Sequence, residues 1–125
     1  MEGVIMTSLE DQKNKTEKGW NISIYPYKTQ GLGLFSRKEG IVSGKHYHKG
    51  NSPSRNPEKG ILISGKAKFY CKNLLTEEEQ EYHVEAPMSW EIFPMIYHEM
   101  HMITDCTFVE RIHEQDKEDF FFLNA

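Results

Sequence analysis

The pattern of apolar and polar residues along the chain is that of short β-strands separated by turns. Residues 20–27 (WNISIYPY) alternate apolar and polar positions and are rich in residues that favour strands. Turn residues recur about every 8 to 12 positions, which is typical of an all-β sandwich or barrel, and no long segment shows the 3.6-residue apolar period of an amphipathic helix. Further strands are expected within residues 31–40, 41–49, 60–73 (two strands joined at Ser64-Gly65), 77–85, 89–94, 98–104 and 106–112.

The length of 125 residues suits a single domain with one core. We expect a polar N-terminal arm or one edge strand in residues 1–19, a barrel in 20–112, and a tail in 113–125 that packs on the barrel or on a partner as a helix or a strand. The tail carries three consecutive phenylalanines, Phe120–Phe122, which are hard to leave in water in a monomer. Because strand edges also need cover, we predict a homodimer.

Composition and charge exclude several classes of function. The net charge is −4 with a pI near 5.9, whereas a nucleic-acid-binding surface is usually basic. The first 15 residues lack the apolar core of a signal peptide, and no run approaches the roughly 18 apolar residues of a membrane span. We therefore expect a cytoplasmic protein that binds neither nucleic acid nor membrane, with Cys71 and Cys106 as reduced, small packing residues.

Two histidines, His46 and His48, are separated by one residue in a segment predicted to be a strand. Alternate residues of a strand face the same side and lie about 7 Å apart, so the two imidazoles can share one metal ion or one substrate. The same pattern also fits two exposed histidines on a surface strand, so the pair needs support from its surroundings.

The spacing around these histidines resembles the two motifs of the cupin family. Five residues separate Gly40 from His46, six separate Glu58 from Gly65, and the turn FPMIY leads to His98. The resemblance covers residues 32–112 and implies a double-stranded β-helix, a jelly-roll-like barrel. It also implies a divalent transition metal (zinc, iron, nickel, manganese or copper) held by His46, His48, Glu58 and His98.

Two features depart from the family pattern. Nine residues separate His48 from Glu58, where three or four are usual. We interpret the extra residues as an insertion in a loop at the barrel mouth; the alternative is that Glu58 lies too far away, which leaves three histidines and water. The glycine that opens the second motif is replaced near residues 86–88, which changes the turn but keeps His98.

Two neighbouring residues are candidates for substrate binding. Arg55 is the one arginine of the long loop, and at a pocket mouth it can hold a phosphate or carboxylate through two hydrogen bonds; it also fits a solvated loop charge. Tyr97 adjoins His98 and is either a proton donor at the pocket rim or a packing residue. The remaining histidines are expected to be structural or solvent-exposed: His83, His101 and His113.

Three functions remain open for a pocket of this kind, which takes a small-molecule ligand or substrate. The first is a metal enzyme such as a dioxygenase acting on a small polar metabolite. The second is a metal-independent isomerase or epimerase in which His46 and His48 are the catalytic acid and base; residues 61–66 and 94–109 are similar to the cupin-type ketoisomerases of nucleotide-linked sugars. The third is a non-catalytic cupin that binds or senses a ligand.

Overall fold

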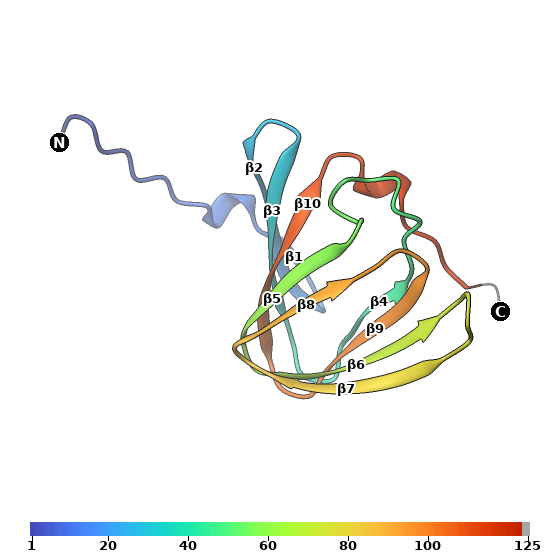
Figure 1. The fold of residues 1–125 in the computed structure, drawn as a ribbon. Helices are drawn as coiled ribbons and strands as arrows, with labels where there is room; N and C mark the ends of the chain where they lie inside the picture. Colours follow the sequence, from blue (N-terminus) through green and yellow to red (C-terminus); the bar gives the residue numbers. More distant parts are fainter. Residues whose placement is uncertain (124–125) are drawn as a thin grey trace.

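The computed structural model describes residues 1–123, apart from the side chain of Tyr27, and these residues form β-strands joined by short connections (Figure 1). Only two short 3₁₀ turns interrupt this pattern in the described residues, η1 (Glu10–Gln12) and η2 (Asp116–Glu118). The strands are β1 (Asn14–Thr16), β2 (Gly19–Tyr27), β3 (Gln30–Arg37), β4 (Val42–His46), β5 (Glu58–Ser64), β6 (Lys66–Asn73), β7 (Glu79–Glu85), β8 (Met88–Ile92), β9 (Ile96–Met102) and β10 (Cys106–His113).

The strands form two antiparallel sheets that face each other. The six-stranded sheet has the order β1-β2-β3-β10-β5-β8, and the four-stranded sheet has the order β4-β9-β6-β7. Strands far apart in the chain are neighbours in both sheets, as when β10 lies between β3 and β5. Figure 1 shows the N-terminal arm extending away from this body. The predicted all-β architecture is confirmed, and β1 is the edge strand expected within residues 1–19.

Alternation along the strands creates the core between the sheets. In β5, Leu62 points inward and is fully buried, while Ile61 and Ile63 point outward. The centre of the core is aromatic: Phe35 stacks on Phe108 with ring centroids 4.9 Å apart. Trp90 of β8 packs between the two sheets, 5.1 Å from Phe69 and 5.8 Å from Phe108 between ring centroids.

The turn between β5 and β6 falls at Ser64-Gly65, as the sequence predicted. Gly65 has a φ of 99°, and a Cβ at this position would lie 2.3 Å from the carbonyl oxygen of Asp105. Only glycine fits this tight approach between backbones. The turn therefore fixes the point at which the chain passes from β5 in one sheet to β6 in the other.

The loop between β4 and β5 and the C-terminal tail lie side by side at one end of the barrel (Figure 1). The backbone of Tyr47 pairs with that of Phe121 through two hydrogen bonds of 2.9 and 3.0 Å. The tail thus packs on its own barrel, through contacts that include this bridge. Phe122, at 67% exposed, still faces solvent.

Both cysteines are free thiols that pack inside the protein. Cys106 is buried in the core cluster, and burial raises the pKa of the half-buried Cys71 to about 11. Both thiols are therefore protonated at neutral pH, in line with the packing role expected from the sequence. Among the described residues, no helix has the length and apolar character needed to cross a membrane.

The homodimer stays a prediction, and the outer face of the six-stranded sheet supplies a surface for it. Leu32, Ile61 and Ile63 are 44 to 54% exposed on that face. We expect sedimentation at micromolar concentration to give about twice the 14.7 kDa chain mass. Ile61→Lys should shift the mass to that of one chain, while Leu75→Lys, on the β6–β7 turn, should leave the dimer intact. A wild-type protein that sediments only as a single chain would contradict the prediction.

Candidate metal centre

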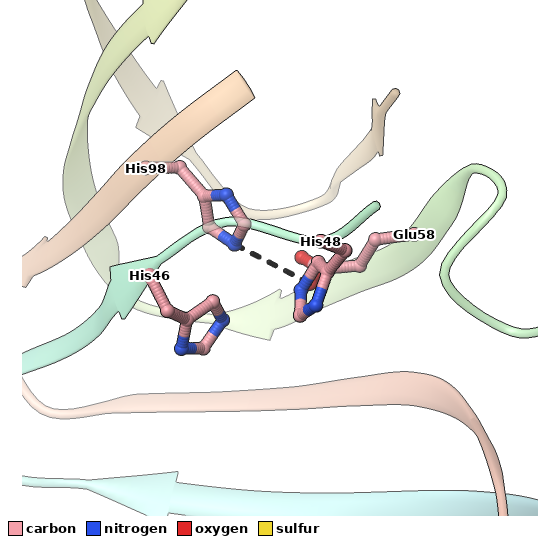
Figure 2. A group of neighbouring side chains, drawn as sticks. All are labelled: His46, His48, Glu58 and His98. Atoms are coloured by element: carbon pink, nitrogen blue, oxygen red, sulfur yellow. Dashed lines mark hydrogen bonds and ion pairs between the residues drawn. The ribbon is translucent and has the colours of Figure 1, made fainter. Parts of the chain in front are cut away.

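Four side chains from three segments of the chain converge at one point inside the barrel (Figure 2). Each offers one nitrogen or oxygen atom, and these atoms all lie within 4.8 Å of one another. Three of the residues are buried and the first is half-buried. We call this set the histidine–glutamate cluster: His46 at the end of β4, His48 in the loop that follows, Glu58 at the start of β5, and His98 in β9.

The paired histidines face the same side, as predicted, although the strand that carries them is not regular. β4 ends at His46, where the pairing with β9 shifts register between Gly44 and His46. Lys45 has a φ of 60°, in the left-handed region. The bridge from Tyr47 to the tail continues beyond the end of β4. As a result the rings of His46 and His48 lie 4.7 Å apart between centroids.

Backbone carbonyls orient two of the imidazoles. Nδ1–H of His48 donates to the carbonyl oxygen of Asp119 at 2.5 Å, and Nδ1–H of His98 donates to that of Ile96 at 3.0 Å. A carbonyl oxygen can only accept a hydrogen bond, so Nδ1 of each ring carries the proton. The Nε2 atoms of both rings therefore point at Oε1 of Glu58, at 3.0 Å from His48 and 3.4 Å from His98.

The carboxylate of Glu58 is 3% exposed and accepts hydrogen bonds through both of its oxygens. Its Oε2 accepts from the indole N–H of Trp90 at 3.2 Å, and its Oε1 accepts from Nη1 of Arg55 at 3.1 Å. Burial raises the pKa of Glu58, but the charge and hydrogen bonds of the neighbouring histidines and Arg55 outweigh burial and hold the pKa well below its usual range. Glu58 is therefore a buried anion.

The histidines around this anion differ from one another. Burial lowers the pKa of His98, but the charge of Glu58 reverses the effect and raises it above its ordinary value. Burial, together with repulsion from His98 and His48, lowers the pKa of His46 to about 3. His46 is thus neutral at pH 7, and within residues 1–123 no protein group hydrogen-bonds to its ring.

The donors of the cluster fit a divalent transition metal. Imidazole nitrogens with one carboxylate oxygen suit zinc, iron, nickel, copper and manganese. In metal sites the outer nitrogen of a ligating histidine usually donates to a carbonyl or carboxylate, which fixes the ring with its other nitrogen toward the metal. His48 and His98 both have this arrangement. Glu58, which the long loop had left in doubt, belongs to the cluster because β5 begins at that residue.

A cavity of about 350 Å³ opens beside the cluster. His46, Glu58 and His98 line it, as does Phe120 from the tail, whereas His48 is not part of its wall. The Phe120 ring meets those of His46 and His48 edge-on, with centroids 4.9 and 5.1 Å apart. The cavity volume is in the range of small-ligand sites.

Arg55 lies within the wall of this cavity and not at a solvated mouth. It is 4% exposed, and besides Glu58 it pairs with Asp116 at 3.3 Å and with Glu110 at 3.6 Å. Buried carboxylates need such a partner, because desolvation penalises an unpaired charge. Arg55 thus forms ion pairs with carboxylates of the protein and is not a solvated loop charge.

Two aspartates of the tail complete the surroundings of the cluster, and sequence reasoning missed both. Asp119 is fully buried, and its carboxylate accepts the backbone N–H groups of Lys49, Gly50 and Ser52 at 2.7 to 3.1 Å. Asp116 accepts from the hydroxyl groups of Ser52 and Ser54. Nothing in the acidic stretch EQDKED distinguishes these residues from solvated charges.

The structure does not bring Tyr97 to the cluster. It alternates with His98 on β9 and faces the other side of the sheet, where its hydroxyl donates to Glu99 at 2.6 Å. His101 shares that side and bonds to the same carboxylate at 2.8 Å, as its spacing from His98 predicted. His83 is exposed on β7, whereas His113 is half-buried and accepts the backbone N–H of Gln115.

Comparisons with known proteins support the fold and leave the activity open. No family model matches the sequence, and no curated protein matches it. Among solved structures, the capsular polysaccharide assembling protein CapF from Staphylococcus aureus is 21% identical with a TM-score of 0.71, over 90% of this chain and 32% of that one. Oxalate decarboxylase from Lactobacillus farciminis in complex with formate is 20% identical with a TM-score of 0.72, over 97% and 37%.

A third structure, which concerns the Mn(II) centres of oxalate decarboxylase from Bacillus subtilis, is 18% identical with a TM-score of 0.67, over 84% of this chain and 28% of that one. The chain spans about a third of the length of the solved chains that it matches. These likenesses show that the chain has the cupin fold, a double-stranded β-helix, as its sequence motifs predicted.

We predict that Asp119 is required for stability. Asp119→Ala leaves three buried or half-buried backbone N–H groups without their acceptor, so the free energy of unfolding should fall by about 3 kcal/mol. Urea unfolding followed by circular dichroism measures this change. Asp11→Ala, at an exposed position, should alter the free energy by less than about 0.5 kcal/mol. Equal unfolding midpoints for the two variants would contradict the role given to Asp119.

Proposed function

We propose that this chain is a small metal-binding cupin that acts as an enzyme on a small polar metabolite. The histidine–glutamate cluster would hold one divalent transition metal, its identity open among zinc, iron, nickel, manganese and copper. One observation carries the proposal: the Nε2 atoms of His48 and His98 face the buried Glu58 carboxylate while their Nδ1–H groups are used elsewhere.

This arrangement needs a positive charge between the rings and the carboxylate. Without one, the Nε2 lone pairs would face an anionic oxygen at 3.0 and 3.4 Å. A proton can bridge one imidazole to Glu58, whereas a metal ion serves all the donors at once. The manganese named for the oxalate decarboxylase of similar fold supports the same kind of occupant.

A bound metal would supply Lewis acidity and open coordination positions beside the cavity. The chain's own residues shape the rest of the site. Phe120 covers the rings of His46 and His48 and limits access of water, and Trp90 and Arg55 fix the two oxygens of Glu58. The cavity of about 350 Å³ limits the substrate to a small molecule.

A second candidate is the metal-independent isomerase or epimerase that uses His46 and His48 as base and acid. It is favoured by the state of His46, which is neutral at pH 7, lines the cavity and has no hydrogen-bond partner among residues 1–123. A free neutral imidazole can take a proton from a carbon next to a carbonyl. Metal content separates this function from the first, and turnover separates both from a non-catalytic binding cupin.

We predict that protein purified without chelator or affinity-column metal contains about one divalent metal ion per chain. His98→Ala should lower the metal content to less than about a tenth, because it removes a ligand whose ring is fixed in place. His101→Ala is the matched control, since it lies on the same strand but faces away, and its metal content should equal that of the wild type. Elemental analysis by mass spectrometry measures all three proteins.

Metal occupancy that does not depend on His98 would refute the site. A wild-type protein that is free of metal yet converts a keto sugar would favour the acid–base function. In that case His46→Ala should abolish turnover while the fold, followed by circular dichroism, is retained.

A further inference from the structure

Three positively charged residues line the cavity and form no ion pair within residues 1–123, although Glu110 lies close enough to Arg37, and Glu99 close enough to Lys45, for their charges to interact. Lys18, Arg37 and Lys45 are all part of the cavity wall. Within residues 1–123 none of them forms an ion pair, although other basic side chains of the protein do, as Lys59, Lys66 and Lys68 illustrate. The chain as a whole carries a net charge of −4. The wall of this cavity therefore holds several basic side chains without an ion pair, although the protein as a whole is negatively charged.

Arg37 is the member of this group that the barrel holds in place. It lies two residues after Phe35 on β3, and its guanidinium sits over the Phe35 ring, 5.3 Å from the centroid. Nη1 donates to the carbonyl oxygens of Trp20 and Ser36 at 2.9 and 3.0 Å, and Nη2 donates to Oδ1 of Asn21 at 3.5 Å. Carbonyl groups and an aromatic ring fix the position of the guanidinium but do not neutralise its charge.

The other arginine of the cavity provides a direct contrast. Arg55 is buried among Glu58, Glu110 and Asp116, so its charge is balanced by protein carboxylates. Arg37 is only half-buried, and the other two basic residues of the wall, Lys18 and Lys45, are exposed. The two guanidinium groups thus differ: Arg55 is paired with carboxylates, whereas Arg37 is held by neutral groups and forms no ion pair within residues 1–123.

We propose that the cavity binds a small oxyanion, a carboxylate or phosphate group of the substrate, and that Arg37 is the residue that binds it. Both N–H groups of Arg37 Nη1 are donated to carbonyl oxygens, but within residues 1–123 its Nε–H and the second N–H of Nη2 form no hydrogen bond, and these two can donate to either oxyanion. Lys18 and Lys45 add to the positive potential that attracts the anion. This inference rests on the proposed function in one respect: it takes the cavity beside the histidine–glutamate cluster as the ligand site.

The test uses succinate and inorganic phosphate as probes on the full chain as purified. Isothermal titration calorimetry at low ionic strength measures Kd for each, and the stronger of the two identifies the type of oxyanion. Arg37→Gln should weaken binding by about tenfold or more, Arg37→Lys should retain part of the affinity, and Lys18→Gln or Lys45→Gln should weaken it about two- to threefold. Lys38→Gln, next to Arg37 but exposed and outside the cavity wall, is the matched control and should bind as the wild type does.

The metal content of each variant keeps this proposal separate from the proposed function. Arg37→Gln should contain as much metal as the wild type, because within residues 1–123 none of the hydrogen bonds of Arg37 goes to the histidine–glutamate cluster. Loss of anion affinity with unchanged metal content and an unchanged circular dichroism spectrum supports the role of Arg37. Equal affinity of Arg37→Gln and wild type for both probes, or no binding of either probe to the wild type, overturns it. A metal-free wild type whose anion binding still depends on Arg37 would defeat the metal proposal alone.

Discussion

The buried negative charge of Glu58 is the constraint on which the interior of this protein depends. A carboxylate at 3% exposure is stable only if it is surrounded by cations and hydrogen-bond donors. The core supplies the indole of Trp90, the loop between β4 and β5 supplies Arg55 and His48, and β9 supplies His98. Core packing and the candidate metal centre therefore share one group, and a change at Glu58 would affect both.

The tail and the long loop hold the residues around Glu58 in place. The insertion between His48 and Glu58 would be free to move if its backbone N–H groups had only water as a partner. Asp119 accepts three of them, and its own carbonyl orients the ring of His48. Hydrogen bonds to a buried charge are stronger than neutral ones. Asp119 of the tail thus fixes a histidine of the candidate metal centre about seventy positions earlier in the chain.

The sequence allowed prediction of those features that follow from local alternation and spacing. The strands, the turn at Ser64-Gly65 and the common side of His46 and His48 all follow from a side-chain period of two. The same rule applies to Tyr97, which adjoins His98 and for that reason faces the opposite side. The inclusion of Glu58 rested on the motif alone, because loop length does not determine where a loop ends in space. Asp119 was beyond prediction, since its role depends on a contact between segments far apart in the chain.

The charges of the cavity connect the two proposals. Glu58 and Glu110 face Arg55, so the inner wall is close to neutral or negative without a metal, and burial together with Glu58 raises the pKa of Glu110 to about 7. A divalent cation on the histidine–glutamate cluster would make the inner wall positive, as Arg37 already makes the outer wall. An oxyanion bound in the cavity would then be attracted both by the metal ion and by Arg37. By linkage, a metal that strengthens anion binding must itself be bound more tightly when the anion is present. The fold is shared with differently named proteins, so under the two proposals this pattern of charge, and not the barrel, would select the substrate of this chain.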